Sequence, residues 1–195
     1  AIFGPGELPH AMDAQQQRAL LARRMAIARL RADLGLPAMP LPAQGPPPLG
    51  CSASGSGGRF LVAVASSPIA IGVDLEIEQR WPLAAQALGI TDLRQAAQCW
   101  VRIEAVVKAA RCGLAEGLGP ELIAGCAAPG PVPCAGGWWN VVDLAVPGGV
   151  AALATSSEVV ACPVMGERNN IAPGNACVTI TNSCTERSKH LRMSE

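Results

Sequence analysis

The sequence has few of the side chains on which several common kinds of site depend. It holds no tyrosine, two phenylalanines, two histidines and two lysines in 195 residues. The histidines, His10 and His190, lie near opposite ends of the chain, so neither a Ser-His-Asp triad nor a histidine-rich zinc site is expected. No apolar run reaches the roughly 18 residues that a membrane-spanning helix needs. We therefore expect no membrane partner.

A net charge of either sign is also missing. Fifteen lysines and arginines balance fifteen acids, so the formal net charge is +0. Proteins that bind nucleic acid or membrane surfaces through electrostatics usually carry a clear excess of one sign. We expect no nucleic-acid partner. Half of the residues are hydrophobic, which is enough for the core of one domain or two small ones.

The cysteines show no metal-binding pattern. They stand at positions 51, 99, 112, 126, 134, 162, 177 and 184, and no pair has the C-x2-C spacing of zinc sites. Scattered cysteines are usually small buried side chains in a reducing compartment. The sequence therefore predicts free thiols and a cytoplasmic location.

The first third of the chain predicts one helix. Asp13 and Gln16 have the spacing of a capping box, and Gly35 followed by Pro37 is typical of a helix end. The apolar stripe consists of Leu20, Ile27, Leu30 and Leu34. The arginines are Arg18, Arg23, Arg24, Arg29 and Arg31; they form either a solvated face or a positive lip near an anionic ligand or acidic partner. A proline-rich connector, 36–50, follows.

Residues 51–58, "CSASGSGG", predict a small-residue loop that can approach an anion closely. Residues 59–65 and 69–77 predict two strands that form a hairpin through 66–68. In the second strand Asp74, Glu76 and Glu78 alternate with apolar residues, so the three acids share one face. Three like charges on one strand face repel one another, so a bound positive group or another chemical role is needed to explain them.

A second helix is predicted between Asp92, as its N-cap, and Gly113, as its end. Trp100, Glu104 and Lys108 lie on one side of it at i, i+4 and i+8. Residues 138–156 predict a strand, a Pro/Gly turn and another strand. The sequence thus predicts two related halves, each with a helix and a hairpin.

These segments together resemble a known family. "SASGSGG", "IGVDLE", "WVRIEAVVKA" and "GGVAALATS" occur in the order of the motifs of the single-chain, pseudo-dimeric 4′-phosphopantetheinyl transferases, over roughly residues 18–157. The resemblance implies an α+β fold of two similar subdomains, each a helix packed on a small, mostly antiparallel sheet. It implies a domain over 1–161, with subdomains at about 13–85 and 86–161, and we expect a disordered tail at 162–195. A pseudo-dimer implies a monomer in solution.

The resemblance also implies a reaction. Such enzymes move phosphopantetheine from coenzyme A to a serine of an acyl- or peptidyl-carrier protein and release 3′,5′-ADP. Asp74, Glu76 and Glu104 would hold Mg²⁺, a cation that prefers oxygen ligands. Glu104 would activate the serine and Lys108 would neutralise phosphate charge. Ser54, Gly55, Ser56, Asp74 and Lys108 would contact coenzyme A. Glu78 matches no family ligand.

Three positions depart from the family motifs. Gly55 stands where the family has histidine, Ile103 replaces the lysine before the motif glutamate, and Pro46 replaces the basic residue of a Gly-Lys-Pro turn. Each lost hydrogen bond to a charged group is worth about 1.5–3 kcal/mol. A weakened or inactive relative that docks carrier proteins is therefore an alternative, unless Arg59, Arg23 or Arg24 compensates.

A metal-dependent nuclease is a third hypothesis, because strand acids and a nearby lysine also suit that chemistry. Its motif needs a lysine two residues after the second strand acid, where this chain has Glu78. The neutral total charge gives no support to nucleic-acid binding.

Overall fold

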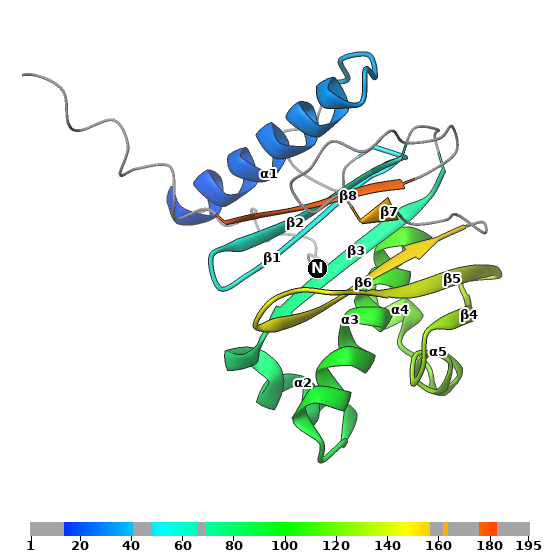
Figure 1. The fold of residues 1–195 in the computed structure, drawn as a ribbon. Coiled ribbons are helices and arrows are strands. Elements are labelled where there is room, and N and C mark those ends of the chain that lie inside the picture. The colour runs from blue at the N-terminus through cyan, green and yellow to red at the C-terminus, as the bar shows by residue number, and fades with distance from the viewer. Residues whose placement is uncertain (1–13, 41–47, 66–68, 157–161, 164–175, 183–195) are drawn as a thin grey trace, which may run out of the picture.

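A computed structural model describes residues 14–40, 48–65, 69–156, 162–163 and 176–182, drawn in colour in Figure 1. The helices are α1 (Ala14–Asp33), α2 (Trp81–Leu88), α3 (Leu93–Ala110), α4 (Leu114–Gly117) and α5 (Pro120–Gly125), with a 3₁₀ turn η1 (Glu78–Arg80). The strands are β1 (Cys51–Ser56), β2 (Arg59–Ala65), β3 (Ile71–Ile77), β4 (Gly130–Cys134), β5 (Gly137–Leu144), β6 (Gly149–Thr155), β7 (Cys162–Pro163) and β8 (Ala176–Asn182).

The strands form two four-stranded sheets, ordered β1-β2-β8-β7 and β3-β6-β5-β4. All pairings are antiparallel except that of β7 with β8. Helix α1 covers the outer face of the first sheet and α3 the outer face of the second, as Figure 1 shows. Apolar side chains of β2, β3 and β6 fill the space between the sheets. The expected α+β class is confirmed at this coarse level.

Helix α1 forms where its apolar stripe predicts it. Ile27 and Leu30 are buried against Val62 and Val64 of β2 and Cys51 of β1. Gly35, in the left-handed region at φ 67°, follows the helix end as predicted. The predicted cap, Asp13, lies outside the described residues.

Residues 51–58 form a strand and a turn, so the expectation of a loop is wrong. β1 pairs with β2 from Cys51↔Val64 to Ser56↔Arg59. Gly57 and Gly58 have φ of 55° and 76°, as a two-residue hairpin turn of type I′ requires. The small residues suit a strand here because β1 lies between α1 and β3 and has little room on either face.

The predicted hairpin between residues 59–65 and 69–77 is also wrong. β3 is in the other sheet, where it pairs with β6 over Ile71↔Thr155 to Ile77↔Gly149. Its even-numbered side chains face α3; a Cβ on Gly72 would lie 2.0 Å from the Ala105 carbonyl oxygen. β3, which was expected in the first subdomain, therefore belongs to a sheet whose other strands were expected in the second. The boundaries 13–85 and 86–161 stay predictions.

Helix α3 begins as predicted, with the Asp92 carboxylate accepting a hydrogen bond from Gln95 N at 2.8 Å. It ends earlier than expected, at Arg111, which adopts φ 56°, while Gly113 becomes the N-cap of α4. The strand–turn–strand at 138–156 is confirmed as β5 and β6. Helices α2, α4 and α5 and strand β4 were not predicted.

The expected disordered tail contributes two strands to the first sheet. β8 pairs with β2 from Arg59↔Asn182 to Ala65↔Ala176, and β7 pairs with β8. This differs from the expectation for 162–195; residues 164–175 and 183–195 lie outside the described part. No helix in the described ranges is both long and apolar enough to span a bilayer.

Candidate functional site

Three serines of β1 connect the two sheets. Ser52, Ser54 and Ser56 occupy alternate positions, so all three side chains point toward β3. The hydroxyl of Ser52 accepts from Val73 N at 3.0 Å, and that of Ser56 accepts from Ile77 N at 3.4 Å. These contacts fix β3 beside β1 although the two strands share no backbone ladder.

Two of these serines also hold the strand carboxylates. Ser54 Oγ donates to Asp74 Oδ1 at 2.7 Å, and Ser56 Oγ donates to Glu76 Oε2 at 2.9 Å. Both serines are buried and their hydroxyls donate to the carboxylates, so they hold the two acids in position. Their predicted contact with coenzyme A stays a prediction.

Lys108 brings the helix and strand acids together. Its Nζ is 2.5 Å from Asp74 Oδ1, 3.2 Å from Glu104 Oε2 and 3.4 Å from Ser54 Oγ. The predicted side chains from β3, α3 and β1 therefore meet at one place. Asp74 is buried, whereas the side chains of Lys108 and Glu104 are 31% and 23% exposed. The site is thus open to solvent on its helix side.

The electrostatics of this group follow from burial. Burial raises the pKa of Asp74 to about 6, and Glu104 adds to this, although Lys108 and the Ser54 hydrogen bond act in the opposite direction. Burial disfavours the charge of Lys108, but attraction by Asp74 and Glu104 outweighs it and raises the lysine pKa. Lys108 therefore stays protonated near neutral pH and does not serve as a general base.

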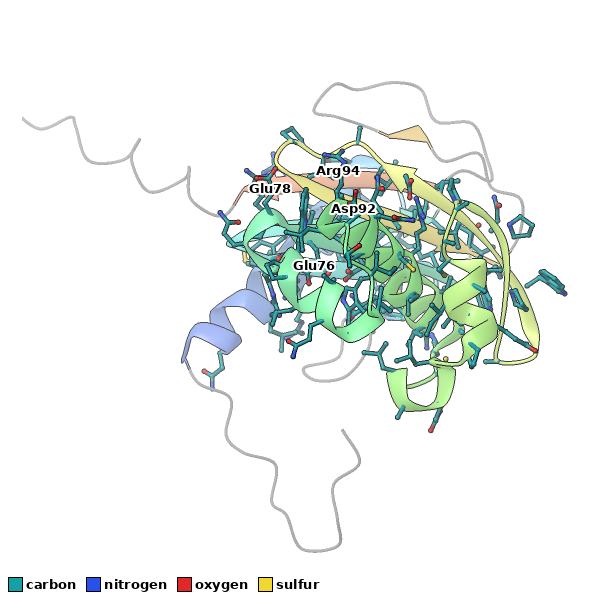
Figure 2. The ribbon with its side chains drawn as sticks, turned by 90° about the horizontal axis from the view of Figure 1, so that it is seen from below. Glu76, Glu78, Asp92 and Arg94 are labelled. Carbon is teal, nitrogen blue, oxygen red and sulfur yellow. The ribbon has the colours of Figure 1, made fainter. Side chains whose placement is uncertain are left out.

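Glu76 lies near the end of β3 and Glu78 just beyond it; Figure 2 labels both side chains. Glu76 lies 3.7 Å from Arg80 Nε in an i,i+4 pair. Glu78 begins the turn η1 and is exposed, as expected of an acid that matches no family ligand. Figure 2 also labels Asp92 and Arg94, which belong to the start of α3.

The oxygen atoms of the site meet part of what a divalent cation needs. Asp74 Oδ2 is buried and has no hydrogen-bond partner, so one carboxylate oxygen is available to a ligand. Mg²⁺ commonly uses one or two carboxylates together with substrate phosphates. In the residues described here, no three histidine, cysteine or acidic side chains are grouped closely enough to hold a metal. Asp74 and Glu104 are the fitting pair, and Glu76 as a third ligand stays a prediction.

The departures from the family motifs have structural reasons. Ile103 is fully buried in the core between α3 and the second sheet, where a lysine would have no water and no partner. A Cβ on Gly55 would lie 2.8 Å from Arg23 Nη2 and 2.9 Å from Phe60 Cδ1. Position 55 is thus already filled by a neighbouring side chain. Pro46 lies outside the described residues.

None of the cysteines whose side chains the structure describes takes part in the site. Those whose side chains the structure describes, Cys51, Cys99, Cys112, Cys126 and Cys134, are free thiols, as predicted. All but Cys112 are buried. Burial raises the pKa of Cys126 to about 12 and that of Cys134 to about 11, so both remain protonated.

Sequence reasoning missed one contribution to the site and left another undecided. The positioning role of the serines is visible only once β1 is known to be a strand, although their alternation at 52, 54 and 56 was a signal. Arg23 was named with Arg59 and Arg24 as a residue that could compensate for the missing groups. The sequence did not select it from these three, because its place beside Gly55 depends on how α1 packs.

Comparison with known proteins adds no relative. No family model matches the chain, no curated protein is significantly similar in sequence, and no solved structure is significantly similar in fold. The family resemblance therefore depends on the sequence motifs alone.

Proposed function

We propose that this protein transfers 4′-phosphopantetheine from coenzyme A to a serine of an apo acyl- or peptidyl-carrier protein, with Mg²⁺ as cofactor. The supporting observation is the meeting of Asp74, Glu104 and Lys108 beside Ser54. These residues come from three elements that are far apart in sequence. The site is partly exposed and holds two carboxylates beside a protonated lysine. This arrangement supports phosphoryl transfer as its role more than that of an ordinary surface ion pair.

The step forms one phosphorus–oxygen bond and breaks another. The serine oxygen of the carrier attacks the β-phosphorus of coenzyme A, and the bond to the bridging oxygen breaks, so that 3′,5′-ADP leaves with the electron pair. Glu104 accepts the serine proton directly or through water, because its carboxylate is partly exposed beside the site. The Lys108 ammonium faces the charge that develops on the phosphate oxygens.

Asp74 and Glu104 would hold the metal, which when bound neutralises phosphate charge. Lys108 now stands between these two carboxylates. Substrate binding therefore requires its ammonium to exchange a carboxylate contact for a phosphate oxygen. Ser54 keeps Asp74 in place during this exchange because its hydroxyl donates to Oδ1.

A catalytically weakened relative that docks carrier proteins is the second candidate. It is favoured by the absence of side chains that the family places at two phosphate-facing positions, since Gly55 offers none and Ile103 is buried. This candidate predicts carrier binding without transfer.

The test is the mass of a carrier protein. An apo carrier is incubated with the protein, coenzyme A and Mg²⁺, and mass spectrometry measures the gain of one phosphopantetheine. We expect the gain, its loss with EDTA, and its loss in Asp74→Asn. Glu78→Gln is the matched control, since Glu78 is an exposed acid just beyond the end of β3. Binding of the carrier without any mass gain would support the docking candidate instead.

A further inference from the structure

Arg23 reaches from α1 to the end of the β1–β2 hairpin. Its Cζ lies 5.6 Å from the centre of the Phe60 ring. Its Nη2 lies 2.8 Å from the point where a Cβ on Gly55 would stand. The guanidinium group is therefore held between an aromatic ring and the bare backbone of β1, in a fixed place near the site.

This guanidinium group has no acceptor within the part of the chain that the structure describes. Its Nε is buried without a hydrogen-bond partner. Asp74 attracts the charge but does not contact it, and burial lowers the pKa of Arg23. The Nε of Arg31 on the same helix also lacks a partner, but the Nη2 of Arg31 donates to the Pro37 carbonyl oxygen at 2.8 Å. An arginine that is held firmly but left without an acceptor is suited to a phosphate oxyanion, which accepts two of its parallel N–H donors.

We propose that Arg23 binds a phosphate group of the substrate, and that it does so from the space which a side chain at position 55 would otherwise fill. The anion subsite is inferred only from the positions of Arg23, Phe60 and Gly55. Its assignment to coenzyme A rests on the proposed function. The absence of a side chain at Gly55 is, on this basis, what admits Arg23 to the site.

Isothermal titration with 3′,5′-ADP, the nucleotide product, tests the subsite in the presence of Mg²⁺. We expect Arg23→Gln to raise Kd by about tenfold or more, because a hydrogen-bonded charge is lost. Arg23→Lys should lie in between, since it keeps the charge and loses the paired donors. Arg29→Gln is the matched control: Arg29 is an exposed arginine of the same helix. Equal affinity in wild type and Arg23→Gln would overturn the proposal.

A second probe separates the subsite from the proposed function. Inorganic pyrophosphate carries phosphate groups without the nucleotide. If wild type binds pyrophosphate through Arg23 but does not bind 3′,5′-ADP, the subsite stands and the coenzyme assignment fails. If wild type binds neither, the subsite itself is wrong.

Thermal unfolding distinguishes a binding role from a structural one. Arg23→Gln removes a half-buried charge that has no acceptor, so the melting temperature should not fall. A fall of more than about 3 °C would mark Arg23 as a structural residue and overturn the proposal.

An exchange of side chains gives the sharpest result. Gly55→His alone should weaken 3′,5′-ADP binding, because its Cβ collides with Arg23 and Phe60. Arg23→Ala with Gly55→His should bind the nucleotide more tightly than Arg23→Ala alone, because the histidine then occupies the vacated space. If Gly55→His binds as tightly as wild type, the two positions do not compete and the proposal is wrong.

Discussion

Lys108 Nζ lies 2.5 Å from Asp74 Oδ1, so a helix cation and a strand carboxylate 34 positions apart in sequence form the centre of the candidate site. The pair is asymmetric, since Asp74 is buried and Lys108 is about one third exposed. Each partner therefore responds differently to pH and to substitution.

The buried carboxyl predicts a pH-dependent stability. The pKa of Asp74 is raised from 3.8 to about 6 in the folded state, so between these values the folded chain binds more protons than the unfolded chain. The contribution of Asp74 to the free energy of unfolding is greatest below pH 4. It falls by roughly 3 kcal/mol as pH rises from 4 through 6. In EDTA, Asp74→Asn should lose this slope in urea titrations, whereas Glu78→Gln should keep it. An unchanged slope in Asp74→Asn would contradict the assignment.

Removal of the lysine leaves Asp74 buried without its cation. Lys108→Ala should lower the free energy of unfolding at pH 8 by roughly 1–3 kcal/mol, less than a fully buried pair would lose, because Lys108 is partly exposed. In the Asp74→Asn background the same change should cost clearly less. Urea denaturation of the four proteins gives the coupling energy, and strict additivity would show that the two side chains do not interact in solution.

A lysine at position 103 should destabilise the fold. Ile103 is fully buried, so Ile103→Lys places an unpaired charge in the core and should unfold much of the protein at 25 °C. The matched change Ile103→Val should cost only about 0.5–1.5 kcal/mol. Circular dichroism measures the folded fraction of each variant. A folded Ile103→Lys protein with wild-type stability would mean that α3 is packed differently.

Gly72 sets the distance between β3 and α3. A Cβ there would lie 2.0 Å from the Ala105 carbonyl oxygen and 2.6 Å from Ala109 N, which are backbone atoms that cannot rotate away. Gly72→Ala should therefore cost about 1–3 kcal/mol or more and displace Asp74 from Lys108. Gly119→Ala, with nothing within 4 Å, should cost less than about 1 kcal/mol. Similar melting temperatures for the two variants would refute the close packing.

β8 gives a prediction about the C-terminal region. It pairs with β2 along seven residue pairs, so removing residues 176–195 leaves the polar backbone of β2 unpaired on that side. We expect a lower melting temperature than for a chain ending at residue 182, which keeps β8. Equal melting by differential scanning calorimetry would mean that β8 contributes nothing to stability.

The sequence by itself determined the elements that local patterns encode. The apolar stripe containing Ile27 and Leu30 predicts α1, the Asp92 cap predicts the start of α3, and alternation around Asp74 predicts β3. The i,i+4 spacing also placed Glu104 beside Lys108. These features depend on residues less than two helical turns apart, where side-chain periodicity is sufficient.

Only the tertiary structure decided which strands pair and what fills the site. β3 pairs with β6, packs closely on α3 at Gly72, and is connected to β1 by serine hydroxyls and not by a backbone ladder. Residues 51–58 became a strand because α1 and β3 leave room for small side chains on both faces. Arg23 reached Gly55 through the packing of α1. Such contacts join residues tens of positions apart, and no local periodicity records them.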